Sequence, residues 1–307
     1  QREVFGPVLH VLRYRRDDLH ALIDQINATG YGLTAGVHTR IDETIAQVAA
    51  RVQAGNLYVN RNMVGAVVGV QPFGGEGLSG TGPKAGGPLY LLRLLAAKPA
   101  DAARRAVAAL GQSADANLNE IGLRPHGDLR GQLSKALQDA ACADADARLS
   151  ALQARLPDLA PRTLTGPTGE RNTYQLRPRP RVLCLATDRA DCLTQLAAVL
   201  AVGAQAVWPA DAQAHAAALP AALQARIALV PDWRAPDAAF DAVLLHGDAQ
   251  AALAAQRSLA QRPGPLVGLT VQPPGSADIP LERLLIEHSI SVNTAAAGGN
   301  ASLMTLG

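Results

Sequence analysis

The sequence LTAGVHTRIDETIAQVAARVQAGNLYVN, residues 33–60, carries two short apolar runs separated by a stretch with a helical period. Residues 33–38 and 56–60 have the length and the flanking Gly and Asn residues that are typical of strands. Between them, Asp42 can begin a helix whose apolar residues share one face. A strand, a helix and a strand in this order predict parallel strands joined by a helical crossover.

The residues ahead of this unit continue the alternation. Residues 7–14 (PVLHVLRY) predict another strand. Asp17 or Asp18 can cap a following helix with an apolar stripe, and residues 27–30 end that helix. The first part of the chain is therefore predicted to belong to an α/β sheet.

A second α/β pattern begins after a helical region. Alanine-rich helices are predicted at 100–110, 129–142 and 145–155, and a Pro/Gly/Thr-rich link follows at 157–169. Beyond it, a helix at 190–201 lies among five predicted strands at 181–186, 206–208, 227–230, 242–246 and 266–271. This predicts a second doubly wound layer. We divide the chain into domains at 1–97, 98–174 and 175–307, and the end of the chain from residue 289 shows no helical period.

Composition excludes several classes of protein. The chain has 307 residues, of which 48% are hydrophobic and 18% charged, so it can bury cores and is not disordered. The net charge of +2 and the few aromatic residues argue against nucleic-acid binding. No apolar run reaches the roughly 20 residues that span a bilayer. Three cysteines suit a reducing cytosol, and we expect a cytoplasmic protein.

A glycine-rich stretch at residues 65–88 is the most informative loop. Its part Gly75–Gly80 spells a dinucleotide fingerprint, but no helix is predicted to follow, so that interpretation fails on context. Backbone N–H groups and the Ser79 hydroxyl can instead cradle a small carboxylate. The alternative is a purely structural turn, and the residues alone leave both open.

The titratable residues point to no other centre. The seven histidines are scattered without the spacing of metal ligands, so we expect no metal. Cys142, Cys184 and Cys192 lie in predicted helices and a strand, which favours structural roles. The turn at residues 186–189 follows a strand but lacks glycine, so it predicts no pyrophosphate site. At the start of the chain, Glu3 precedes an aromatic residue and a Gly-Pro turn. Its carboxylate suits a ribose diol, although a surface glutamate is the simpler interpretation.

Taken together, these segments resemble the carboxyl-terminal part of an aldehyde dehydrogenase. Residues 3–8 (EVFGPV) are similar to the E-x-F-G-P motif of that superfamily, and residues 71–75 (QPFGG) to its P-F-G-G motif. Residues 69–88 resemble the aldehyde anchor loop of L-glutamate-γ-semialdehyde (Δ1-pyrroline-5-carboxylate) dehydrogenases. Residues 292–305 resemble the terminus of the proline utilization A family of bifunctional proline-catabolic enzymes.

The resemblance implies a fold and an activity. The fold would be the end of an aldehyde dehydrogenase catalytic domain, followed by a non-catalytic, Rossmann-like doubly wound α/β domain. The activity would be NAD-dependent oxidation of L-glutamate-γ-semialdehyde to glutamate, coupled to an upstream proline dehydrogenase that uses FAD. The nucleophilic cysteine would lie upstream, so this chain would hold no catalytic residue and be inactive alone. We read the chain, which starts at Gln1, as the tail of a longer polypeptide.

The resemblance also implies contacts for particular residues. Glu3 and Phe5 would contact NAD. The residues implied to contact the substrate are Phe73, Gly77, Ser79 and Gly80. The implied partners are the upstream domains of the same polypeptide and further copies in a homo-oligomer, with the parent peripheral at a membrane. The alternative function is a non-catalytic assembly module that closes a tunnel between two active sites.

Overall fold

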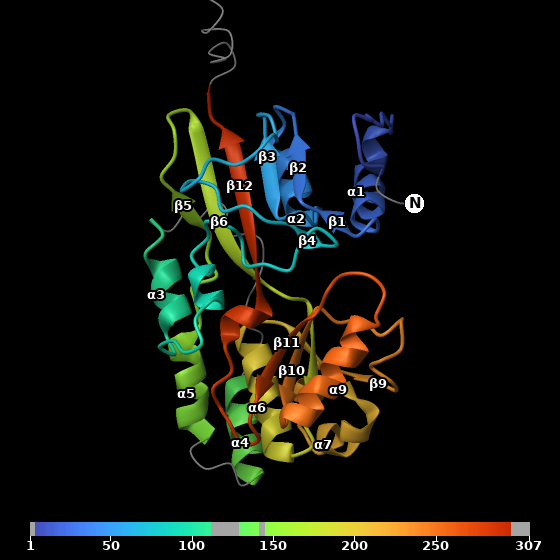
Figure 1. The fold of residues 1–307 in the computed structure, drawn as a ribbon, viewed down its shortest axis with the longest axis vertical. Coiled ribbons are helices and arrows are strands. Elements are labelled where there is room, and N and C mark those ends of the chain that lie inside the picture. Colours follow the sequence, from blue (N-terminus) through green and yellow to red (C-terminus); the bar gives the residue numbers. More distant parts are fainter. Residues whose placement is uncertain (1–3, 112–128, 141–144, 296–307) are drawn as a thin grey trace, which may run out of the picture.

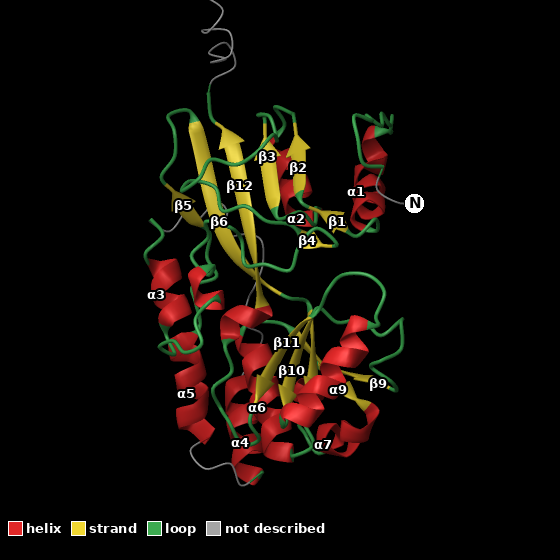
Figure 2. Cartoon of the chain, viewed as in Figure 1, coloured by secondary structure: helices red, strands yellow, loops and turns green. Residues whose placement is uncertain are grey.

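Two five-stranded sheets lie one above the other along the long axis of the molecule (Figure 1). The structure, a computed structural model, describes residues 4–111, 129–140 and 145–295, with only the backbone of residues 129 and 130. Helices flank the lower sheet in Figure 2, and the upper sheet carries a small two-stranded ribbon at its lower end. Among the described residues, no helix is both long and apolar enough to cross a bilayer.

The lower sheet confirms the second predicted α/β layer. Its order is β11-β10-β7-β8-β9, and every neighbouring pair is parallel. Its strands are β7 (Arg181–Leu185), β8 (Gln205–Pro209), β9 (Ile227–Val230), β10 (Ala242–His246) and β11 (Gly268–Gln272). All five residues of β10 are buried, as expected for a central parallel strand covered on both faces.

Helices cover both faces of this sheet. On one face α6 packs with α4 and α5 in a core that contains Leu149, Leu152, Leu193 and Leu196. On the other face α9 packs with Trp233, and Phe240 belongs to the same core. The helices are α4 (Leu129–Asp139), α5 (Ala145–Arg155), α6 (Arg189–Ala201), α7 (Gln213–Ala217), α8 (Ala221–Gln224) and α9 (Ala249–Ala260). The doubly wound prediction is therefore confirmed.

The upper sheet joins strands that are far apart in the sequence. Its order is β2-β3-β12-β6-β5. These strands are β2 (Thr34–Val37), β3 (Asn56–Val59), β5 (Arg162–Leu164), β6 (Glu170–Pro178) and β12 (Leu285–Asn293). β12 runs parallel to β3 and antiparallel to β6 along nine residue pairs. This one sheet therefore takes strands from all three ranges into which the sequence was divided.

Sequence reasoning missed β5, β6 and β12. Residues 157–169, predicted as a link, contain β5, and β12 includes residues 289–293, for which no element was predicted. The reason lies in burial, because Glu287, His288 and Ser289 of β12 are buried polar residues that hide the apolar alternation of a strand. The residues from 296 onward lie outside the described part of the chain.

The predicted strand at residues 7–14 is wrong. These residues pair with no strand of the described chain, and Leu9 and Val11 are exposed. An extended segment becomes a strand only when a neighbour takes its backbone hydrogen bonds. The apolar alternation is present here without such a neighbour.

The helices predicted around the upper sheet and before β5 are confirmed. They are α1 (Leu19–Asn27), α2 (Asp42–Arg51) and α3 (Ala102–Ala108). The capping prediction for α1 fails, because residues 16–18 form a 3₁₀ turn and Asp18 makes no side-chain cap. Ile23 of α1 and Val48 of α2 pack with Leu57 of β3 in the core of the upper sheet.

Leu57 offers a test of this upper core because its side chain has no exposed surface. We expect Leu57→Ala to lower the free energy of unfolding by about 2–5 kcal/mol through lost burial and the cavity it leaves. Leu91 is 70% exposed, and Leu91→Ala should cost less than about 0.5 kcal/mol. Urea unfolding of the two variants measures the difference, and equal losses would contradict this core.

Candidate functional site

The glycine-rich loop folds back against the chain ahead of β2 as a short ribbon. β4 (Glu76–Gly77) pairs antiparallel with β1 (Tyr31–Gly32). The Leu78 N–H donates to the Gly30 carbonyl at 2.8 Å and extends this contact. We call residues 74–80 the anchor turn. No helix begins directly after this turn, so the fingerprint-like string has the wrong context for binding a pyrophosphate.

Two glycines of the anchor turn are required by its backbone. Gly77 has a φ of 60°, and a Cβ on it would lie 2.3 Å from the Gly30 carbonyl oxygen. A Cβ on Gly75 would lie 2.6 Å from the Cβ of Ser79. Because no side chain fits at either position, the turn brings backbone groups closer together than other residues allow.

Ser79 and Gly80 present hydrogen-bonding groups at the end of the turn. The Gly32 N–H donates to Ser79 Oγ at 3.0 Å, so the hydroxyl proton is left to donate elsewhere. The Gly80 N–H reaches the Gly77 carbonyl only at 3.5 Å, which is a long contact. Ser79 is half-buried, so the turn is not sealed inside an apolar core.

A cleft of about 510 Å³ opens beside the turn, between the two sheets. Glu76, Gly77, Gly80 and Arg177 of β6 line it on the side of the upper sheet, and Asp241, which precedes β10, lines it on the side of the lower sheet. The predicted substrate-contacting glycines therefore reach an open space.

The remaining predicted contacts do not converge on the turn in the same way. Phe73 is half-buried and pairs with Ala85 through two backbone hydrogen bonds of 3.0 and 2.8 Å. Phe5 is 95% exposed. Glu3 lies outside the described residues. The roles of these three residues therefore stay predictions.

Lys84 holds the two ends of the loop together, a role that the sequence did not suggest. Its side chain is buried, and Nζ donates to the Gly55 carbonyl at 2.7 Å, to Asn56 Oδ1 at 2.8 Å and to the Gly74 carbonyl at 2.6 Å. These three bonds use all three donors of the ammonium group. Burial lowers the pKa of Lys84 to about 8, against the opposing charges of Glu287 and Glu76.

Asn56, the first residue of β3, adds two more bonds to the same loop. Its Oδ1 accepts from the Gly74 N–H at 3.1 Å, and its Nδ2 donates to the Pro72 carbonyl at 3.0 Å. Ser289 of β12 also donates to the Pro72 carbonyl, at 2.9 Å. The start of the anchor turn is thereby tied to two neighbouring strands.

Glu287 of β12 binds the far end of the loop. One carboxylate oxygen accepts from the Lys84 backbone N–H, and the other accepts from the Tyr174 hydroxyl at 2.8 Å. Burial raises the pKa of Glu287, and these hydrogen bonds and the Lys84 charge oppose that rise. Burial also raises the pKa of Tyr174, so its phenol stays protonated and donates.

Charges of both signs surround the anchor turn. Glu76 is the acidic residue of the turn itself; burial raises the pKa of its carboxyl, and Arg177, Lys84 and Arg179 oppose the rise. Glu287 acts on both Lys84 and Arg179, and Asp241 acts on Arg179, so these carboxylates partly balance the cations.

The described thiols are not nucleophiles. Cys184 and Cys192 are both buried. Burial raises the pKa of Cys192 to about 12 and that of Cys184 further, so neither forms a thiolate near neutral pH. Cys142 lies outside the described residues. Among the residues that the structure places, no group of three His, Cys, Asp or Glu side chains is arranged to hold a metal ion.

The lower sheet offers no place for a pyrophosphate at its first crossover. The turn after β7 has no glycine, and the Asp188 carboxylate accepts from the N–H groups of Ala190 and Asp191 at the start of α6. A side-chain anion already occupies the donors that would bind a phosphate.

The chain is similar in sequence to known proteins. Residues 1–99 match the aldehyde dehydrogenase family. The whole chain is 56% identical over 317 residues to the carboxyl-terminal part of the bifunctional protein PutA of Escherichia coli (strain K12), of which it covers 23%. It is 47% identical over 316 residues to PutA of Rhizobium meliloti, of which it covers 24%. The chain therefore spans about a quarter of the length of these relatives.

The anchor-turn part also matches shorter relatives. Over 98 residues the chain is 44% identical to 1-pyrroline-5-carboxylate dehydrogenase of Bacillus subtilis (strain 168), which is 32% of this chain and 19% of that protein. Among solved structures, proline utilization A from Corynebacterium freiburgense matches 91% of this chain and 24% of its own, with a TM-score of 0.57 and 22% identity. This likeness shows the shared fold.

Substitution of Lys84 tests whether its three hydrogen bonds stabilise the glycine-rich loop. We expect Lys84→Met to lower the free energy of unfolding at pH 7 by about 2–4 kcal/mol, since each buried acceptor left without a donor costs roughly 1–3 kcal/mol. Lys135 is exposed on α4, and Lys135→Met should be nearly neutral.

The same two variants also test whether the pKa of Lys84 is lowered in the folded protein. Between about 8 and 10.5, the folded Lys84 is neutral while the unfolded one is protonated. The unfolded state binds more protons there, so stability rises with pH through this group. The gap between wild type and Lys84→Met should therefore widen from pH 8 to pH 10.5 in urea unfolding, and a narrowing gap would show that the pKa is not lowered.

Proposed function

We propose that this chain, whose residues 1–99 belong to the aldehyde dehydrogenase family, provides the substrate anchor of an enzyme that oxidises L-glutamate-γ-semialdehyde to glutamate. The enzyme would be a longer bifunctional polypeptide of proline catabolism, like the PutA relatives. The observation that carries the proposal is the anchor turn, in which Gly80 lines an open cleft and the half-buried Ser79 precedes it directly.

The turn is built to bind a carboxylate rather than an aldehyde oxygen alone. The Gly32 N–H already donates to Ser79 Oγ, so the Ser79 proton is free for a substrate oxygen. The long Gly80 contact can be exchanged for a shorter bond to the same carboxylate, because hydrogen bonds to a charged acceptor are stronger. In this proposal Gly77 lets the substrate approach the backbone, and Phe73 lines the aldehyde end.

The oxidation itself needs groups beyond the described residues. The family reaction uses a cysteine thiolate, and neither buried thiol described above can supply it. The N-terminus of α6 does not fit the pyrophosphate of NAD, because the Asp188 carboxylate already accepts from its N–H groups. NAD would accept the hydride when bound, with Glu3 and Phe5 proposed as contacts. FAD would serve the proline dehydrogenase of the longer polypeptide.

A second role is supported by the upper sheet. β6 and β12 precede and follow the lower domain in the sequence, and they supply two of the five strands of the sheet that supports the anchor turn. The lower domain can therefore serve as an assembly module that holds the loop in place without any chemistry. Homo-oligomers in the cytoplasm, with the parent protein peripheral at a membrane, belong to the same proposal.

Ser79→Ala in the enzyme that contains this chain tests the anchor. We expect the KM for glutamate semialdehyde to rise by roughly 10- to 100-fold, since a hydrogen bond to a charged group is worth about 1.5–3 kcal/mol. The KM for a neutral aldehyde should change little. Steady-state kinetics measure the KM of the variant for both aldehydes. Ser258→Ala on α9 is the control variant. Equal effects on the two aldehydes would remove the anchor role.

The 307-residue chain alone should not reduce NAD in the presence of glutamate semialdehyde, because neither thiol in the described part of the chain forms a thiolate near neutral pH. The measurement is absorbance of NADH with the purified chain. Turnover abolished by a thiol-blocking reagent would show that one of the three cysteines is the nucleophile, and it would overturn this part of the proposal.

A further inference from the structure

Three arginines from separate segments converge on one small crevice next to the anchor turn. Arg93 belongs to the 3₁₀ turn at residues 91–93, Arg179 follows β6, and Arg283 lies in the 3₁₀ turn ahead of β12. They line a crevice of about 30 Å³ together with Thr81 and Thr270. None of the described residues that line it is an aspartate or a glutamate.

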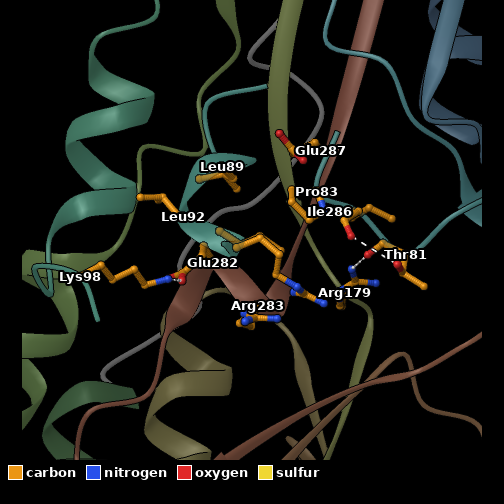
Figure 3. Close-up of a pocket in the computed structure, with 13 residues that line it drawn as sticks. Thr81, Pro83, Leu89, Leu92, Lys98, Arg179, Glu282, Arg283, Ile286 and Glu287 are labelled. Carbon is orange, nitrogen blue, oxygen red and sulfur yellow. Dashed lines mark hydrogen bonds and ion pairs between the residues drawn. The ribbon is translucent and has the colours of Figure 1, made fainter. Parts of the chain in front are cut away.

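An adjoining crevice of about 40 Å³ shares Thr81 and the same three arginines (Figure 3). Its two acidic residues already have partners. Glu282 pairs with Lys98, as the dashed line in Figure 3 shows, and Glu287 binds the Tyr174 hydroxyl and the Lys84 N–H. Both carboxylates are therefore engaged by other groups, although the charge of Glu287 still acts on Arg179.

The guanidinium groups have unused donors. Each has five N–H donors, and Arg179 uses one of them on the Thr81 carbonyl at 2.9 Å. The side chains of Arg93 and Arg283 form no hydrogen bond or ion pair with any residue that the structure describes. Arg262, by contrast, donates to three backbone carbonyls and lies 4.3 Å from the centre of the Phe240 ring. Arg262 has a structural role that the other three arginines lack.

Arg93 and Arg179 also repel each other. Burial is the main cause that lowers the pKa of Arg179; the Arg93 cation adds to this lowering, whereas the charges of Asp241, Glu76 and Glu287 oppose it. Arg93 is exposed, and the other two arginines are half-buried. Cations held close together are stabilised when an anion binds between them.

We propose that this crevice is a binding site for a phosphate group, either inorganic phosphate or the head of a phosphate monoester. A water-sized probe needs about 10–15 Å³, so the crevice of about 30 Å³ can take roughly two oxygens of a phosphate while the rest of the ligand stays in solvent. The planar guanidinium fork matches the oxygens of phosphate two at a time. The site differs in chemistry from the anchor turn, which offers neutral donors to a carboxylate.

The site also touches the anchor turn. Thr81, whose carbonyl binds Arg179, directly follows Gly80. A phosphate that recruits Arg179 would act on the residue next to the proposed carboxylate donors.

The experiment uses the natural polypeptide that carries these 307 residues. Inorganic phosphate is titrated by calorimetry at constant ionic strength, with sulfate, glycerol phosphate and glutamate in parallel. We expect saturable binding of phosphate, and Arg93→Gln and Arg283→Gln should each weaken it by about tenfold or more, as the loss of one charge-assisted hydrogen bond predicts. Arg40→Gln, at an exposed position after β2, is the matched control and should bind like wild type. Tighter binding of glycerol phosphate than of inorganic phosphate would identify a monoester as the ligand.

A measurement on the unmutated protein covers the case in which a variant does not fold. Phenylglyoxal modifies exposed arginines, and phosphate should protect Arg93 and Arg283 but not Arg40, as read by peptide mass spectrometry. The proposal is overturned if phosphate does not bind saturably, if all three arginines are protected equally, or if glutamate protects and phosphate does not. None of these results depends on aldehyde oxidation, so they are independent of the proposed activity.

Discussion

The position of β12 between β3 and β6 is the constraint on which the rest of the structure depends. β12 pairs with β3 through four residue pairs and with β6 through nine. Because both neighbours precede the lower domain in the sequence and β12 follows it, the upper sheet is complete only when the chain has passed through the lower domain. Ser289 and Glu287 of this strand then bind opposite ends of the glycine-rich loop. The strand that completes the sheet is also the one that positions the candidate site.

The loop is held by polar bonds in a place where polar groups are costly to bury. Lys84, Asn56, Glu287 and Tyr174 are all buried, and each has partners for its side-chain groups. A satisfied network of this kind rigidifies a backbone that has few apolar side chains of its own. Glycine makes the anchor turn sterically possible, and the network selects one conformation for it. Rigid donors are what a carboxylate anchor requires, because they need no rearrangement when the substrate arrives.

The lower domain shows how a doubly wound sheet can lose the site that such folds commonly carry. Its strand order and its crossovers match the type that binds dinucleotides at the carboxyl ends of the strands. The helix that would meet the phosphates begins instead with Asp188, whose carboxylate takes the free N–H groups. The domain therefore keeps the architecture and contributes packing and strands to the upper sheet. Its arginine crevice lies at the junction with the anchor turn, away from the carboxyl end of β7.

The sequence by itself determined the elements that depend on local pattern. The parallel lower sheet, its helices, α1, α2, β2 and β3 follow from apolar periodicity, and the glycines mark the loop at residues 65–88. It did not determine β6 and β12, whose buried polar residues break the pattern, or the segment at 7–14, which has the pattern without a partner strand. Ser79 was predicted as a site residue from its glycine neighbours, whereas Lys84 was not, because its backbone partner Glu287 lies 203 residues away in sequence. Only the tertiary structure brings such groups together, since a hydrogen bond between distant residues leaves no trace in the residues around either one.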